Sequence, residues 1–175
     1  MRGEHGMDNT VLREMTWDPE AGRLLFKDVR YLLIRLETLA AIYRGMLTLG
    51  ASPAEVLYQA GHAGGVKSGT HYRQVLGLAA EEAVRFMAQM GGQIGWGSMR
   101  VAQLDLGRRE LILEVTGSPF AEALRPSAEP VCHLIRGIFG GVAVGVLGWA
   151  VEAREESCVS MGAPKCVFVI RSKGG

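Results

Sequence analysis

The amino-acid sequence predicts an α+β domain in which an antiparallel sheet packs against helices. Pairs of short runs with alternating apolar residues are joined by turn-forming residues, which is the pattern of β-hairpins. Between these pairs lie longer segments whose apolar residues recur at helical spacing. Strands that pair as hairpins and are interrupted by helices are typical of an α+β domain rather than of a doubly wound parallel sheet.

The first part of the chain is predicted to hold one hairpin followed by two helices. Residues Gly22–Arg35 contain two short apolar runs on either side of the turn-prone pair Lys27-Asp28. Residues Glu37–Leu49 repeat apolar side chains with helical periodicity. A second helix is expected to begin at Ser52-Pro53, because serine is a favoured N-cap and proline is tolerated in the first helical turn.

A glycine-rich segment follows at Gly61–Gly69, with the sequence GHAGGVKSG. A phosphate-binding loop needs a glycine directly before the lysine and an apolar strand before the loop, but here Val66 precedes Lys67. We therefore interpret the segment as a bend between two helices. Residues Glu81–Met90, with acidic residues at their start and apolar residues at helical spacing, predict a further short helix.

The second part of the chain is predicted to hold two hairpins on either side of one long helix. Residues Val101–Asp105 and Glu110–Val115 alternate apolar side chains and are joined by a glycine-containing turn. Residues Val131–Val151 are predicted to form a long, largely buried helix. The last hairpin is expected to pair Ser157–Ser160 with Lys165–Arg171.

Length and charge favour one globular domain. A chain of 175 residues falls within the usual size of a single domain. Residues 1–21 are polar and rich in turn formers, so we expect a flexible N-terminal arm, followed by a single domain over residues 22–175. The net charge of +1 predicts no basic surface that would attract nucleic acid.

No segment is predicted to enter a membrane. The uncharged stretch Gly137–Val151 has 15 residues, whereas a spanning helix needs about 20. The first ten residues lack the apolar core of a signal peptide. An odd number of cysteines, three, without a secretion signal favours reduced thiols and a cytoplasmic location.

Two of the cysteines and a carboxylate lie close together at the predicted last hairpin. Cys158 and Cys166 are symmetrically placed about Gly162, so a turn centred there would set them opposite each other, with Cβ atoms about 4.5–5.5 Å apart. Glu155 precedes Cys158 by three residues and reaches the same point if the strand is bulged or still helical there. Glu156 is equally available on spacing alone.

Cys132, at the start of the long predicted helix, is available as a fourth ligand. Three thiolates and one carboxylate suit a tetrahedral zinc ion. The alternative is core packing, because free cysteine is among the most buried residue types and often acts as a small apolar side chain. Spacing alone leaves both interpretations open.

Motifs around these residues resemble a known family. The stretches PVCHLIRGIFGG and REESCVSMGAPKCVFVI, together with GWG at Gly95–Gly97 and SPFAEA at Ser118–Ala123, are similar to the 4-vinyl reductase domain family, from about Gly22 to Arg171. The resemblance implies an α+β fold that also occurs in vesicle-tethering complex subunits. Family members include a protein associated with bacteriochlorophyll synthesis and the sensor domains of phenol- and xylene-responsive transcription activators.

The resemblance implies that Cys132, Glu155, Cys158 and Cys166 hold a zinc ion, and it favours Glu155 over Glu156. Four protein ligands leave no position open for water, so the zinc is expected to be structural and to fix the last hairpin to the long helix. No catalytic residue is predicted, because the sequence contains no Ser-His-Asp or paired-acid pattern and its histidines stand alone.

The resemblance also implies a ligand pocket between the sheet and the helices, beside the zinc. Val142, Val146, Trp149 and Ala153 would form one face of the long helix, and Arg136 is a possible partner for a ligand carboxylate. The alternative for these residues is ordinary core packing. Positions that are aromatic in the phenol sensors are Arg136 and Ala153 here, which favours a larger, flatter or more aliphatic ligand than phenol.

A second face of the predicted helix is unusually flat, because it carries glycine at three positions. Another helix could pack closely there, either an internal neighbour or the helix of a dimer partner. The three positions are Gly141, Gly145 and Gly148.

The function that the sequence favours is a zinc-containing domain that binds or senses a hydrophobic small molecule. We expect it to form a homodimer and to act through a separate protein partner. One alternative is an accessory protein or reductase acting on tetrapyrrole vinyl groups, as in bacteriochlorophyll synthesis, although no nucleotide, flavin or iron–sulfur motif accompanies it. A second alternative is a non-catalytic scaffold subunit.

Overall fold

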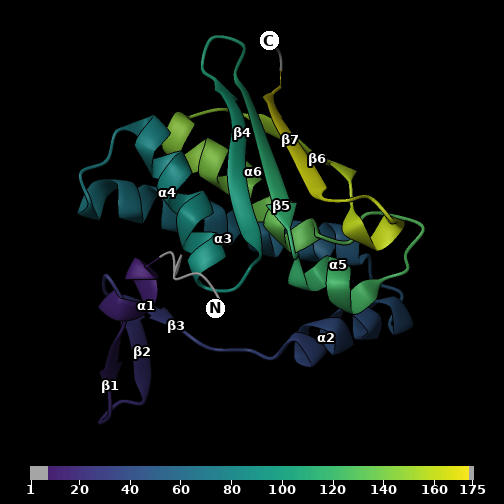
Figure 1. Ribbon diagram of the computed structural model, residues 1–175, viewed down its shortest axis with the longest axis horizontal. Helices are drawn as coiled ribbons and strands as arrows, with labels where there is room; N and C mark the ends of the chain where they lie inside the picture. The colour runs from purple at the N-terminus through teal and green to yellow at the C-terminus, as the bar shows by residue number, and fades with distance from the viewer. Residues whose placement is uncertain (1–7, 174–175) are drawn as a thin grey trace, which may run out of the picture. The chain divides into compact units, whose positions relative to one another are not determined.

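The computed structural model describes residues 8–173. The chain divides into two compact units, Met1–Leu33 and Ile34–Gly175 (Figure 1). The predicted division into an arm of residues 1–21 and a domain of residues 22–175 is a different one, and it stays a prediction. Among residues 8–173, no helix combines the length and the apolar character needed to cross a membrane.

The first unit contains a short helix and a three-stranded antiparallel sheet. Helix α1 (Thr10–Glu14) precedes β1 (Thr16–Asp18), β2 (Arg23–Phe26) and β3 (Val29–Tyr31), which pair in that order. Lys27 and Asp28 both have positive φ angles, 47° and 63°, and form a two-residue turn of the kind that joins tight hairpins. The hairpin predicted around this pair is therefore confirmed.

Three helices open the second unit, α2 (Leu36–Thr48), α3 (Pro53–Val75) and α4 (Ala80–Gln93). The Ser52 hydroxyl accepts a hydrogen bond from the backbone N–H of Glu55 and caps α3, as predicted. The bend predicted at Gly61–Gly69 is wrong, because α3 runs through these residues without a break. Its glycines serve the packing of α3 against another helix.

The sheet of the second unit has four antiparallel strands in the order β4-β5-β7-β6. They are β4 (Ser98–Asp105), β5 (Glu110–Thr116), β6 (Val151–Ser157) and β7 (Cys166–Ser172). Both hairpins predicted for this half are present, β4 with β5 and β6 with β7. The α+β class with an antiparallel sheet packed against helices is confirmed.

Between β5 and β6 lie the short helix α5 (Pro119–Leu124) and the longer helix α6 (His133–Leu147). The prediction that this helix continues to Val151 is wrong. Gly148 adopts a left-handed conformation with φ of 70° and ends α6, and Val151 then begins β6. A single-turn 3-10 helix, η1 (Val159–Met161), connects β6 to β7.

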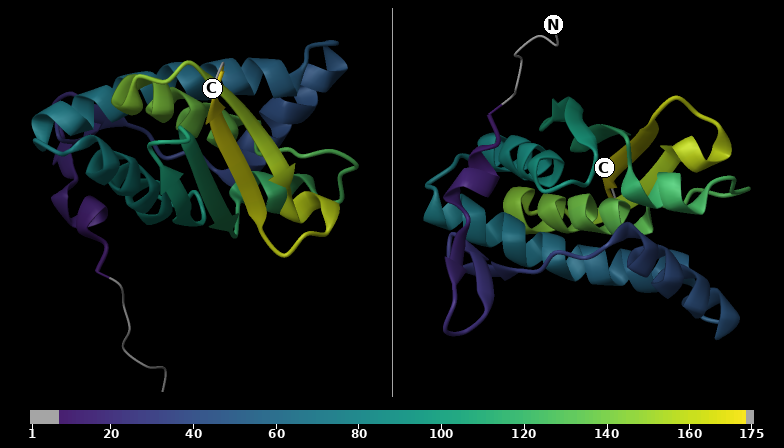
Figure 2. Two further views of the ribbon diagram at one scale, coloured as in Figure 1. Left: turned by 90° about the horizontal axis from the view of Figure 1, so that it is seen from above. Right: turned by 60° about the horizontal axis from the view of Figure 1, so that its bottom comes forward.

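Helix α6 lies between α3 and the sheet (Figure 2). Glycines on both helices let their backbones touch: a Cβ atom built on Gly65 would lie 2.0 Å from the carbonyl oxygen of Ile138, and one built on Gly141 would lie 2.2 Å from that of His62. The same holds at Gly61, Gly137 and Gly145. The flat face of α6 thus packs against an internal neighbour. Gly148 lies beyond it, at the helix end.

This packing places the start of α6 next to the β6–β7 connection. The buried side chains of the sheet meet α6 on its other side, and the core between them includes Leu111, Leu113, Val115, Ile135, Phe139, Phe168 and Ile170. The N-terminus of α6 and the adjoining ends of β6 and β7 together form the site described next.

Candidate metal centre

The structure brings together the four residues predicted as metal ligands. Cys132 is the N-cap of α6, Glu155 lies on β6, Cys158 follows β6 and Cys166 begins β7. One ligand atom from each residue lies within 4.8 Å of the others. All three cysteines are fully buried and in the reduced, unpaired state.

A β-bulge in β6 puts Glu155 and Cys158 on the same side of the strand. In a regular strand, residues three apart point to opposite faces. The register with β7 shifts between Glu155 and Ser157, so Glu156 is the extra residue and is exposed. The bulge that the sequence left as one possibility is therefore present, and it separates Glu155 from Glu156.

The distances between the sulfur atoms fit a single tetrahedral ion. The Sγ atom of Cys132 lies 3.9 Å from that of Cys158 and 3.7 Å from that of Cys166, and the latter two are 3.8 Å apart. Ligands about 2.3 Å from a tetrahedrally coordinated ion, the usual Zn–S distance, are about 3.8 Å from one another. The same distances are far too long for disulfide bonds, whose sulfur atoms are about 2.05 Å apart.

The carboxylate of Glu155 also fits an ion at this point. Its Oε2 atom accepts a hydrogen bond of 2.9 Å from the backbone N–H of Cys132. Its Oε1 atom is buried and has no hydrogen-bond partner. A buried carboxylate oxygen without a partner is costly, and a cation among the three sulfur atoms would supply the missing interaction.

Without an ion, the cluster holds its acidic protons tightly. Burial, together with the neighbouring Cys158, raises the pKa of Glu155 to about 8. Hydrogen bonds to Cys158 and Cys166, and burial, raise the pKa of Cys132. Hydrogen bonds from Cys132 and Cys166 lower the pKa of Cys158, so this sulfur carries the negative charge in the metal-free cluster. A metal ion must therefore displace protons as it binds.

Sequence reasoning missed two side chains that contact the sulfur atoms. The hydroxyl oxygen of Ser118 lies 3.1 Å from the Cys132 sulfur, and that of Ser160 lies 3.0 Å from the Cys158 sulfur. Ser118 stands directly before α5, whereas Ser160 lies in η1. The Ser118-Pro119 pair indicated only the end of a strand, and no spacing rule pointed to Ser160.

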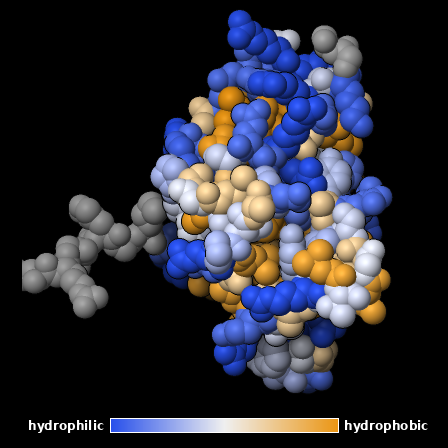
Figure 3. Space-filling model, turned by 90° about the vertical axis from the view of Figure 1, so that its right-hand side faces the viewer, coloured by the Kyte–Doolittle hydropathy of each residue, from blue (hydrophilic) through white to orange (hydrophobic). Residues whose placement is uncertain are grey.

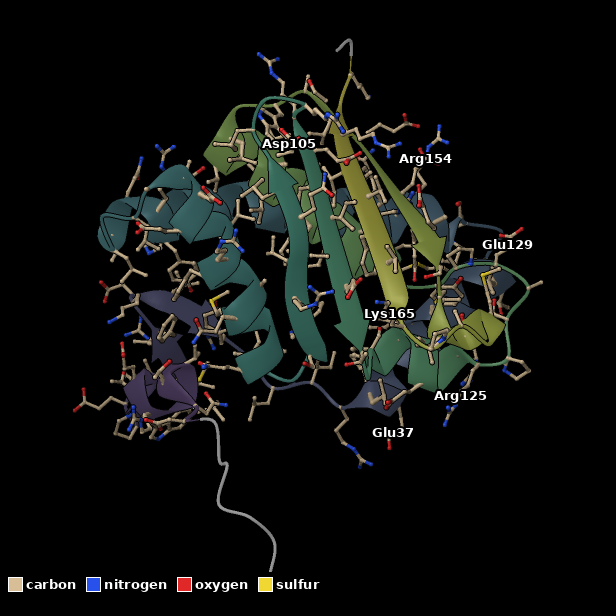
Figure 4. All side chains as sticks on the ribbon, turned by 45° about the horizontal axis from the view of Figure 1, so that its top comes forward. Glu37, Asp105, Arg125, Glu129, Arg154 and Lys165 are labelled. Atoms are coloured by element: carbon tan, nitrogen blue, oxygen red, sulfur yellow. The ribbon has the colours of Figure 1, made fainter. Side chains whose placement is uncertain are left out.

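A pocket of about 540 Å³ lies beside the cluster. It is lined by side chains of α2, by the end of α5 and by residues 125–131, and Arg125 and Glu129 lie at the end of the sheet that carries Lys165 (Figure 4). Its wall includes Tyr43, whose ring stacks on that of His133, next to Cys132. Figure 3 looks onto this side of the molecule and shows apolar residues interspersed with hydrophilic ones.

The five predicted pocket residues do not share one helical face. Val142 and Val146 are buried on α6 and contact the position of Gly69, whereas Trp149 follows the end of the helix and Ala153 lies on β6. The pocket described above is lined by other residues. The assignment of these side chains to a ligand stays a prediction.

Arg136, the fifth of these residues, is engaged in contacts that hold three elements together. Its guanidinium donates hydrogen bonds to the carbonyl oxygens of Ala54 and Ala153, at 3.0 and 3.4 Å. It also lies over the ring of Tyr58, 4.7 Å from the ring centre. Its Nε atom is buried without a partner.

The comparisons with known proteins agree with this geometry. The model of the 4-vinyl reductase domain family matches residues 111–172, about a third of the chain. No curated protein sequence matches the chain. The crystal structure of the phenol-responsive sensory domain of the transcription activator PoxR with phenol has a TM-score of 0.82, 17% sequence identity, and covers 93% of this chain and 86% of that domain.

Two further solved structures are similar with lower scores. A vinyl-4-reductase family protein from Methanocaldococcus jannaschii has a TM-score of 0.59 and 17% identity, and covers 82% of this chain and 84% of that one. A trafficking protein particle complex subunit 3 from Naegleria fowleri, covalently bound to palmitic acid, has a TM-score of 0.53 and 18% identity, and covers 79% of this chain and 95% of that one. At these identities the likeness concerns the fold.

The match to the family model extends from β5 to β7 and includes all four members of the cysteine and glutamate cluster. The resemblance to the 4-vinyl reductase domain family that the sequence predicted is thereby confirmed, and residues 111–172 carry its pattern.

Proposed function

We propose that this chain is a zinc-containing module that binds a hydrophobic small molecule and passes the binding event to a protein partner. The ion held by Cys132, Glu155, Cys158 and Cys166 is zinc, because three thiolates and one carboxylate in a tetrahedral arrangement suit that metal. With four protein ligands it acts as a structural ion. When bound, it supplies a fixed link between α6 and the β6–β7 connection.

The observation that carries this proposal is the position of the 540 Å³ pocket relative to the cluster. Its volume falls in the range of small-molecule sites, about 300–1,000 Å³. The wall formed by residues 124–131 ends at Cys132, and the backbone N–H of Ser127 donates to the carbonyl oxygen of Ser160, beside Cys158. The metal centre therefore fixes one wall of the pocket.

The lining indicates a ligand with an apolar body and a polar group. Apolar side chains such as Leu47, Leu124 and Val131 line the pocket together with Arg44 and Arg125. The PoxR sensory domain, solved with phenol, supports ligand binding by this fold. The predicted face around Arg136 and Ala153 is the second candidate location for the ligand.

Dimerisation and the cytoplasm are further parts of the proposal. Ile42 and Leu47 on α2, and Leu49 directly after it, are exposed by 44%, 57% and 86%. Apolar side chains left in water at neighbouring positions are typical of a surface that meets a partner. A second copy of the chain is the partner that we propose for this surface.

Ligand binding is tested with three probes on the zinc-loaded protein: phenol, palmitate and protoporphyrin IX. We expect phenol or palmitate to raise the melting temperature and to bind with a saturable calorimetric signal. Binding of protoporphyrin alone would instead support the tetrapyrrole alternative. If none of the three shifts the melting temperature, the small-molecule function is contradicted and the scaffold alternative gains support.

Two tryptophan variants locate the site. Ala128→Trp places a large side chain in the pocket and is expected to raise the dissociation constant at least about tenfold, the factor that corresponds to about 1.4 kcal/mol. Ala63→Trp, at an exposed position on α3, is the matched control and should bind as the parent does. If Ala128→Trp binds normally and Arg136→Gln does not, the ligand occupies the predicted face instead.

A further inference from the structure

Every member of the cysteine and glutamate cluster has one hydrogen-bond donor from outside the set of ligand side chains. Two donors are serine hydroxyls, and two are backbone N–H groups. The pairs are Ser118 with the Cys132 sulfur at 3.1 Å, Ser160 with the Cys158 sulfur at 3.0 Å, the Val159 N–H with the Cys166 sulfur at 3.4 Å, and the Cys132 N–H with the Glu155 carboxylate at 2.9 Å.

We propose that Ser118 and Ser160 are positioning residues of the metal centre: their hydroxyl groups donate hydrogen bonds to the thiolates of Cys132 and Cys158 and thereby stabilise the metal-bound form. This inference rests on the proposed metal site and concerns residues outside the ligand set. Donors of this kind orient metal ligands and adjust how much negative charge each ligand gives to the metal.

The direction of the Ser118 hydrogen bond follows from its second contact. Its oxygen accepts the backbone N–H of Ala121 at 3.5 Å, as the N-cap of α5. The hydroxyl proton is then free to point at the Cys132 sulfur. A metal-bound cysteine has lost its proton and can only accept, so the serine is the donor.

Burial and charge explain why such donors are needed. Ser118 is fully buried and Ser160 is 3% exposed, so water does not replace either hydroxyl. Three thiolates and a carboxylate around a divalent cation leave an excess of two negative charges. Charge in a buried site is expensive unless hydrogen-bond donors surround it, and bonds to charged acceptors are about twice as strong as neutral ones.

The same serines connect the metal to the wall of the pocket. Ser118 begins α5, whose last residue lines the pocket, and the Ser160 carbonyl holds the N–H of Ser127 in that wall. A change in either hydroxyl contact therefore alters the support of residues 118–132 as well as the charge on the sulfur atoms.

The test uses cobalt(II) in place of zinc, because the sulfur-to-cobalt charge-transfer absorption reports the charge on the thiolates. We expect Ser118→Ala and Ser160→Ala to shift this absorption to longer wavelength, since a thiolate without a hydrogen bond gives up an electron more easily. Zinc should pass to a competing chelator about 10–100 times faster, the usual cost of losing such a partner.

Ser52→Ala is the matched control for Ser118→Ala. Ser52 also caps a helix and precedes proline, but its hydroxyl contacts the N–H of Glu55 on α3. It should leave the cobalt spectrum and the rate of zinc release unchanged. Ser118→Thr and Ser160→Thr keep the hydroxyl and should restore the parental spectrum, which a purely structural role would not require.

The outcomes separate this inference from the proposed function. A parent protein that takes up neither zinc nor cobalt would contradict the metal site itself. A parent that binds both metals, with alanine variants that match Ser52→Ala in spectrum and zinc release, would overturn only the role of the serines. If Ser118→Ala does not fold, the Ser160→Ala and Ser160→Thr pair decides the question.

Discussion

Replacement of Gly65 by alanine is expected to destabilise the protein severely. The added Cβ atom would lie 2.0 Å from the carbonyl oxygen and 3.0 Å from the Cα atom of Ile138 on α6. Backbone atoms in the middle of a helix cannot turn aside as a side chain can. The two helices would have to separate, which also opens the contacts at Gly61 and Gly141.

The expected cost exceeds that of ordinary overpacking, which is about 1–3 kcal/mol. We therefore expect Gly65→Ala to lower the free energy of unfolding by at least about 3 kcal/mol, measured by urea denaturation of the metal-loaded protein. A loss of this size approaches the total stability of many domains, about 5–15 kcal/mol. A population of unfolded chain at room temperature would agree with the prediction.

The neighbouring Gly64 is the control. It lies on the same helix, is exposed, and has no atom within 4 Å of the position a Cβ would take. Alanine is favoured over glycine inside a helix by about 0.5–1 kcal/mol, so Gly64→Ala should raise stability by roughly that amount. Equal stability of Gly64→Ala and Gly65→Ala would contradict the close contact between α3 and α6.

These glycines show where the sequence was read correctly and where it misled. Glycine lowers helix propensity, so Gly61–Gly69 predicted a bend, yet the segment is helical because its buried glycines meet the backbone of α6. Propensity is local, whereas this contact joins segments about 75 residues apart. On α6, spacing did reveal the flat face at Gly141 and Gly145, but it left an internal neighbour and a dimer partner as alternatives.

The metal cluster was predictable to a different degree. Symmetry about Gly162 anticipated the approach of Cys158 and Cys166, since β6 and β7 pair in that register beyond the bulge. The bulge itself is set by the pairing of two strands, so spacing alone could not choose between Glu155 and Glu156. The family resemblance made that choice, and the structure places Glu155 in the cluster.

The serine donors were not predictable from the sequence. Ser118 and Ser160 reach the cluster from two separate connections, one before α5 and one after β6. A hydroxyl that donates to sulfur follows no fixed spacing from its acceptor. Such partners become visible only when the topology has brought the connections together.

Cys158→Ser is expected to abolish stoichiometric metal binding and to lower stability by several kcal/mol. Cys158 is fully buried and its sulfur lies within 4 Å of both other cysteine sulfurs, so no other side chain can take its place. A metal present at about 1,000 times its dissociation constant contributes about 4 kcal/mol to folding. For a chain of this length, that loss lowers the melting temperature by about 8–16 °C.

The decisive comparison is between metal-loaded and metal-free forms. Metal removal should lower the melting temperature of the parent protein and leave that of Cys158→Ser unchanged. Metal content per chain and a free-thiol count, made without a histidine tag, check the same point. A Cys158→Ser protein as stable and as metal-rich as the parent would show that the cluster is core packing.

The two adjacent glutamates give the sharpest test of the ligand set. Glu155→Gln removes a ligand and should weaken zinc binding by more than the 10–100-fold that the loss of an outer partner typically costs. Glu156→Gln changes an exposed residue of the same type at the bulge and should bind zinc as the parent does. Equal losses in both variants would contradict the assignment of Glu155.

The pH dependence of binding follows from the same residue. In the metal-free protein the pKa of Glu155 is raised to about 8, mainly by burial, so its carboxyl is protonated at neutral pH. Zinc must displace this proton and the protons of Cys132 and Cys166, and its affinity should therefore fall steadily as the pH drops below about 8. In Glu155→Gln one of these protons is absent, so the remaining affinity should depend less steeply on pH than in the parent. Equal slopes would mean that zinc binds without the Glu155 carboxylate.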